Sequence, residues 1–196
     1  MLYYLARGVT MLIGIDIDDT LINTREKQLI YWANYVTKNP KDGYTKELPA
    51  TINYFDDKYI NIFWDTYREH LAFEPSFKDN VSSVLHKLKK EGFNFCIVTA
   101  RREKNCPNIQ RKIKNWFKEN DIPIDIIYTD IDNKGQFCKE NNIEIFIDDD
   151  IKNITNANEY NIKTIMFNNN PAYNGLQTDN WLDLYNILIK LKEEQN

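Results

Sequence analysis

The stretch "IGIDIDDTLINT", Ile13 to Thr24, decides the fold, because a run of β-forming residues ends there in a cluster of acids. The acids are Asp16, Asp18 and Asp19. Carboxylates at the end of a buried strand repel one another and lose hydration, so something must offset that cost. The stretch therefore predicts a functional site at the end of a buried strand.

Further β-rich segments follow this one, and helix-like segments separate them. Gly92 is expected to stop the first helix, and Thr178 or Asp179 to cap the last. Strands that alternate with helices form a parallel sheet covered on both faces, which predicts an α/β fold. Ligands bind such sheets beyond the carboxyl ends of the strands. The predicted strands are 12–17, 93–100, 124–130, 143–149 and 162–168, and the predicted helices are 78–91, 106–120, 133–141, 151–159 and 179–192.

The gap between the first two strands, about 75 residues, is longer than one crossover helix requires. Residues 78–91 supply that helix, which leaves 22–75 as an insertion that we interpret as a small helical cap. The core is then 11–21 with 76–196, and residues 1–10 form an extension of unclear role. The cap is rich in aromatic residues, which either build its own core or stack on a substrate ring. They are Tyr31, Trp32, Tyr35, Tyr54, Phe55, Tyr59, Phe63, Trp64 and Tyr67.

Composition limits the partners and the compartment. The 196 residues are 42% hydrophobic, enough to bury one domain core. The net charge of −4 argues against a nucleic-acid duplex or an anionic membrane as the main partner. No apolar run approaches the roughly 20 residues of a membrane span. Cys96, Cys106 and Cys138 lack CxxC spacing, which favours free thiols in the reducing cytoplasm.

The acids at the strand ends suggest a division of chemical roles. Residues two apart in a strand point to the same side, so Asp16 and Asp18 should aim together. One carboxylate can act as nucleophile and metal ligand while the other shuttles a proton. A hard cation such as Mg²⁺ would relieve their repulsion, and Asp148 and Asp149, which end another predicted strand, can complete its coordination.

Three further residues can contribute to a phosphate site. Thr99 ends a third strand and can donate to a phosphate oxygen, and Lys134 can bring a positive charge to the same edge of the sheet. Lys152 is an alternative for that lysine. Arg101 is either a bidentate phosphate ligand or part of a structural ion pair, and the residues alone leave both open.

In this order the residues resemble the motifs of the haloacid dehalogenase superfamily of phosphotransferases. Asp16-Ile17-Asp18-Asp19-Thr20 matches the motif DxDx(T/V), Thr99 in "FCIVTAR" matches the second, Lys134 the third, and Asp148–Asp149 in "FIDD" the fourth. The resemblance implies a Rossmann-like sheet of strand order 5-4-1-2-3, with a helical cap inserted after the first strand. The stretches 20–27 and 72–80 would then be the hinges of that cap.

The resemblance also implies a mechanism. Asp16 would attack phosphorus to form an aspartyl-phosphate, and Asp18 would exchange the protons. Thr99 and Lys134 would bind the phosphoryl oxygens. Mg²⁺ would be held by Asp16, the Asp18 backbone carbonyl, and Asp149 or Asp148, with Asp149 favoured.

Within the superfamily the chain looks most like the 5′-nucleotidase and deoxyribonucleotidase branch, on "GIDIDDTL", "FWDTYRE", "VTAR" and "FIDDD". We therefore expect a Mg²⁺-dependent phosphomonoester hydrolase of (deoxy)nucleoside monophosphates. The alternatives are a phosphatase of another small metabolite, such as a sugar phosphate, and a phosphoacceptor receiver domain. A receiver would need an isolated acceptor Asp after a later strand and would lack the long insertion.

Overall fold

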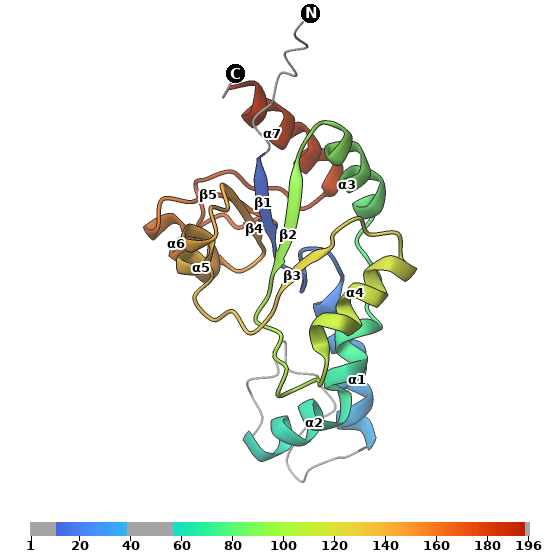
Figure 1. Cartoon of the computed structure of the whole chain (residues 1–196). Coiled ribbons are helices and arrows are strands. Elements are labelled where there is room, and N and C mark those ends of the chain that lie inside the picture. The colour runs from blue at the N-terminus through green and yellow to red at the C-terminus, as the bar shows by residue number, and fades with distance from the viewer. Residues whose placement is uncertain (1–10, 39–56, 195–196) are drawn as a thin grey trace, which may run out of the picture.

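The structure, a computed structural model, describes residues 11–38 and 57–194. The expected extension 1–10 and the middle of the predicted insertion, with Tyr54 and Phe55, lie outside the described residues. Five strands of the described chain form a parallel sheet in the order β3-β2-β1-β4-β5, which confirms the expected order (Figure 1). Each strand is shorter than predicted. They are β1 (Leu12–Ile15), β2 (Asn94–Val98), β3 (Ile126–Tyr128), β4 (Ile145–Asp148) and β5 (Lys163–Met166).

Helices cover both faces of the sheet, as the sequence predicts. On one face α3 (Val81–Lys90), α4 (Ile109–Glu119) and α7 (Trp181–Glu193) bury apolar side chains against the strands. On the other face lie α5 (Lys134–Glu140) and α6 (Ile151–Glu159), which pack around a smaller cluster. In the described part of the chain, no helix is long and apolar enough to cross a membrane.

The helix caps agree with the sequence at one end and differ at the other. Gly92 follows α3 with φ of 90°, a conformation that glycine adopts without strain, so the predicted stop is confirmed. The predicted caps Thr178 and Asp179 are wrong, because the N-cap of α7 is Asn180, whose side chain accepts from the N–H of Asp183 at 2.8 Å. Asp179 instead accepts from a loop side chain, and Thr178 pairs with β5 through its backbone.

The remaining two helices lie away from the sheet (Figure 1). α1 (Thr24–Lys38) and α2 (Asp57–Phe73) pack against each other around a buried cluster of their own. The segments that lead into α1 and out of α2 run side by side, since Asn23 N–H donates to the Ser76 carbonyl at 2.9 Å. The arrangement fits a cap on two adjacent connections, although the exact division of the chain remains a prediction.

Candidate active site

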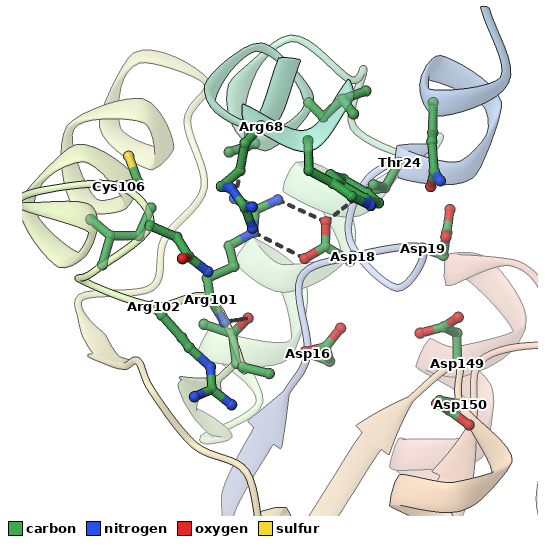
Figure 2. Close-up of a pocket in the computed structure, with 18 of the residues that line it drawn as sticks. Asp16, Asp18, Asp19, Thr24, Arg68, Arg101, Arg102, Cys106, Asp149 and Asp150 are labelled. Atoms are coloured by element: carbon green, nitrogen blue, oxygen red, sulfur yellow. Dashed lines mark hydrogen bonds and ion pairs between the residues drawn. The ribbon is translucent and has the colours of Figure 1, made fainter. Parts of the chain in front are cut away.

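A cavity of about 460 Å³ lies where the carboxyl ends of the central strands meet α1 and α2 (Figure 2). Strands end in a common edge of a parallel sheet, so residues far apart in sequence come together there. Five of the six predicted site residues line this cavity: Asp16, Asp18, Thr99, Lys134 and Asp149. Asp148 lies directly behind them.

A buried lysine joins two of the strands. Lys134, the first residue of α5, donates from Nζ to Asp16 Oδ1 at 2.6 Å and to Asp148 Oδ2 at 2.7 Å. All three residues are at most 5% exposed. Asp16 follows β1 and Asp148 ends β4, and both carboxylates turn to the face of the sheet that α5 covers. The structure thus brings the lysine and one acid from each strand into direct contact.

Asp148 is fully occupied by the protein. Besides Lys134, its oxygens accept from the Asn153 amide at 3.0 Å and from the Asp150 N–H at 2.8 Å. Asp149, the next residue, is half-buried and lines the cavity instead. Adjacent residues of an extended chain point to opposite sides, so Asp148 contacts Lys134 while Asp149 faces the cavity.

Two of the acids that line the cavity, Asp16 and Asp149, are short of positive charge. Burial raises the pKa of Asp16 to about 7, although the charge of Lys134 works against it. Burial, with the charges of Asp148, Asp16 and Asp19, raises the pKa of Asp149 to about 8. A cation placed between Asp16 and Asp149 would therefore be strongly stabilised.

The donor set fits Mg²⁺ rather than a protein-enclosed metal. Among the described residues, no three Asp, Glu, His or Cys side chains are close enough to hold an ion. Mg²⁺ usually binds through one or two carboxylates and keeps several waters or phosphate oxygens. Asp16 and Asp149 can supply those carboxylates.

Asp18 has a different environment from Asp16. Its Oδ1 accepts from Arg101 Nη2 at 2.8 Å and from the Thr24 hydroxyl at 2.7 Å, and its Oδ2 accepts from Arg101 Nε at 3.0 Å (Figure 2). Partial burial opposes ionisation of this carboxyl, but the charge and hydrogen bonds of Arg101 outweigh it and lower the pKa of Asp18. Of the two alternatives for Arg101, the structure therefore shows the ion pair.

The other predicted residues are also placed. Thr99 is 1% exposed, and its oxygen accepts from the Arg101 N–H at 3.3 Å, so the Thr99 O–H hydrogen can be donated to a ligand. The side chain of Lys152 is exposed on α6, so Lys134 is the lysine at the site. Asp150 also lines the cavity, and it caps α6 by accepting from the Lys152 N–H at 2.9 Å.

Sequence reasoning missed most of the wall that the cap provides. Trp64, Arg68, Leu71 and Ala72 of α2 line the cavity, and their spacing of i, i+4, i+7 and i+8 places them on one face of the helix. The sequence shows that these residues share one face of the helix, but it does not show which part of the protein that face meets. The other lining residues that were missed are Thr24, Gln28, Ala100, Arg102, Asn105, Cys106, Ile109 and Asn153.

The cap aromatics divide between the two expected roles. Trp32, Tyr35 and Phe63 are buried in the cap cluster, which fits a structural core. Trp64 packs against this cluster and also lines the cavity, with the Arg68 guanidinium 5.9 Å from its ring centroid. Trp64 is thus the aromatic residue of the described cap that is placed to touch a ligand.

Comparisons with known proteins identify the fold. No family model matches the chain, and no curated protein matches it by sequence. Among solved structures, a protein described as a predicted phosphatase from Clostridium acetobutylicum is 16% identical, with 92% of this chain and 99% of that chain covered and a TM-score of 0.65. A protein assigned as a β-phosphoglucomutase from Thermotoga maritima is 13% identical, with 92% and 99% covered and a TM-score of 0.66.

A third solved structure comes from Bacillus subtilis and is assigned as a haloacid dehalogenase-type hydrolase. It is 14% identical, covers 91% of this chain and 98% of its own, and has a TM-score of 0.61. Its description records bound magnesium and interdomain movement. The chain therefore has the haloacid dehalogenase-like fold, as the sequence motifs implied.

Proposed function

We propose that this protein is a Mg²⁺-dependent phosphomonoester hydrolase that works through an aspartyl-phosphate on Asp16. The contact of Lys134 with Asp16 and Asp148, at the floor of a cavity that Thr99 and Asp149 also line, carries the proposal. It combines a nucleophile, a fixed cation, a hydroxyl donor and a second acid within one cavity. The descriptions of the solved structures with this fold, a phosphatase and a magnesium-bound hydrolase among them, support it.

The residues have distinct roles in this reaction. An Asp16 oxygen forms a bond to phosphorus as the bond from phosphorus to the leaving oxygen breaks. Asp18 gives a proton to that oxygen from its protonated form, which the Arg101 pair disfavours. As the carboxylate that Arg101 stabilises, it later accepts a proton from the water that hydrolyses the aspartyl-phosphate. Thr99 and the remaining N–H of Lys134 hold the phosphoryl oxygens, since an ammonium has three hydrogens to donate and two are used.

The proposed metal ligands are Asp16, Asp149 and the backbone carbonyl of Asp18. Bound there, Mg²⁺ would neutralise charge on the phosphoryl oxygens. The occupied oxygens of Asp148 support Asp149 over Asp148 as the direct ligand. The Asp18 side chain, which Arg101 and Thr24 hold, is left for proton transfer.

For the substrate we propose a (deoxy)nucleoside 5′-monophosphate. Trp64 offers a ring on which a base can stack, and Gln28 and Arg68 on the same wall offer hydrogen-bond donors. A sugar phosphate is the second candidate, because the T. maritima structure of the same fold is described as a β-phosphoglucomutase. The strand order argues against a receiver domain, since those sheets have the order 2-1-3-4-5.

The first experiment is phosphate release from nucleotides, deoxynucleotides and sugar phosphates, with and without Mg²⁺. We expect turnover that chelation removes and that Asp16→Asn abolishes. Trp64→Ala should raise the KM for nucleotides, whereas the control Ile62→Ala, an exposed residue of α2, should not. Activity that survives Asp16→Asn contradicts the aspartyl-phosphate mechanism. Turnover of sugar phosphates but not of nucleotides contradicts the proposed nucleotide substrate.

Metal binding can be measured without turnover. Mg²⁺ should raise the melting temperature of the wild-type protein, because a ligand that binds the native state stabilises it. The shift should be lost in Asp149→Asn and kept in Asp150→Asn. We also propose a cytoplasmic location, which the three free cysteines of the structure favour.

A further inference from the structure

We propose that Arg101 is a positioning residue that fixes the proton-transfer group Asp18 and ties it to the exit of the cap. The inference rests on the proposed function and adds a role that the resemblance does not assign. It depends on one cluster of contacts at the mouth of the cavity, where the loop after β2 meets α2 (Figure 2).

The Arg101 guanidinium is committed to the protein on both sides. Nε and Nη2 form a fork on the two Asp18 oxygens, at 3.0 and 2.8 Å. Nη1 donates to the backbone carbonyl of Ala72 at 2.7 Å. The Arg101 side chain is 9% exposed. Its guanidinium carbon lies 5.9 Å from the ring centroid of Phe73 and 6.0 Å from that of Trp116. A forked pair fixes both the position and the rotation of a carboxylate, which a single contact cannot do.

The same carboxylate is joined to both connections of the cap. Thr24, the first residue of α1, donates its hydroxyl to Asp18 at 2.7 Å. Ala72 lies in the last turn of α2 and reaches Asp18 through Arg101. The first residue of α1 contacts Asp18 directly, and the last turn of α2 contacts it through Arg101. The orientation of the Asp18 side chain therefore depends on the position of the cap.

The arrangement leaves Asp18 able to meet a substrate. Its side chain is 39% exposed and lines the cavity, and Oδ2 accepts from Arg101 alone among the contacts of the described residues. Arg101 lines the cavity beside Asp18, but its guanidinium donates to Asp18 and Ala72, so a leaving oxygen can approach Asp18 from the cavity. Arg101 acts through Asp18 and not on the transferred phosphoryl group.

The leaving group distinguishes this role from the alternatives. A poor alkoxide leaving group needs a proton donor, whereas a nitrophenolate leaves without one. We expect Arg101→Ala to lower kcat for an alkyl phosphate about 10- to 100-fold, with less than about a 3-fold loss for p-nitrophenyl phosphate and little change in KM. Arg111→Ala, an exposed arginine of α4, is the matched control and should have no effect.

A double-mutant cycle tests whether Arg101 acts through Asp18. In the Asp18→Asn background, Arg101→Ala should cost less than about 2-fold, because the group that it positions is already disabled. If the alanine variant does not fold by circular dichroism, Arg101→Lys replaces it and should show the same pattern at smaller size, since lysine keeps the charge but not the fork.

The inference is overturned if Arg101→Ala lowers kcat equally for the alkyl phosphate and for p-nitrophenyl phosphate. It is also overturned if the loss of kcat is equal in the wild-type and Asp18→Asn backgrounds. Either result indicates that Arg101 binds phosphate directly. Wild-type levels of alkyl phosphate turnover in Arg101→Ala overturn it as well. No turnover of any phosphomonoester by the wild-type protein refutes the proposed function itself, which is a separate and recognisable result.

Discussion

Replacing Lys134 with methionine tests the buried charge cluster most directly. Methionine is similar in length to the apolar stem of lysine, but it removes the charge between Asp16 and Asp148 and the ammonium that lies 5.8 Å from the Phe146 ring centroid. Asp148 keeps the Asn153 amide and the Asp150 N–H, whereas Lys134 is the side chain of the described structure that bonds the Asp16 carboxylate. The loss therefore falls mainly on Asp16.

The expected size follows from burial. Removing one partner of a buried ion pair costs about 3 to 5 kcal/mol, because the other charge stays desolvated. All three residues are at most 5% exposed, so water screens the remaining carboxylates only weakly. We expect Lys134→Met to lose about 3 to 5 kcal/mol of unfolding free energy at pH 8.

The deficit should depend on pH in a defined direction. Burial raises the pKa of Asp16 from 3.8 to about 7 even with Lys134 present, and removing that lysine raises it further. A protein with a carboxyl group whose pKa is higher in the folded state loses unfolding free energy as the pH rises from the unfolded pKa to the folded pKa of that group. The deficit should therefore be about 1.4 kcal/mol larger at pH 8 than at pH 5, because between pH 7 and pH 8 the folded variant still binds the Asp16 proton that the folded wild-type protein has released.

Urea unfolding, followed by circular dichroism at pH 5 and at pH 8, measures the loss of unfolding free energy in Lys134→Met. Lys152→Met is the matched control, because Lys152 is exposed and should change stability by less than about 0.5 kcal/mol. A Lys134→Met deficit below about 1 kcal/mol at pH 8, or one that is equal at pH 5 and pH 8, would refute the buried cluster and this account of its electrostatics.

Two further predictions concern the α5 and α6 side of the sheet. Gly135→Ala should destabilise by about 1 to 3 kcal/mol in thermal unfolding, because a Cβ there would lie 2.6 Å from the Asn156 carbonyl oxygen of α6; an unchanged melting temperature would contradict this close packing. Cys96 and Cys138 should resist a disulfide reagent at pH 8 until urea unfolds the chain, since burial raises the pKa of both thiols to about 12; rapid labelling of either in the native state would contradict their burial.

The sequence by itself determined the sheet and the residues at its edge. Each strand and helix has a local pattern, and in a parallel sheet every strand ends at the same edge, so Asp16, Thr99 and Asp149 had to converge. The oversized gap after the first strand located the insertion for a similar reason, because a crossover needs only one helix.

Only the tertiary structure decided what each of these groups contacts. Strand alternation predicts that Asp148 and Asp149 point to opposite sides, but which of them faces inward depends on where α5 places Lys134. The same holds for Arg101, whose partner Asp18 is 83 residues away. Side-chain pairings over such distances arise from packing of several elements at once, and no local pattern encodes them.

The cap illustrates the same limit. The stripe of Trp64 and Arg68 on α2 was present in the sequence, yet a helix face has no preferred neighbour until the chain folds against it. The N-cap of α7 moved to Asn180 because the backbone of Thr178 pairs with β5. Local chemistry therefore determined which residues could act, and the packing of distant segments decided which of them meet.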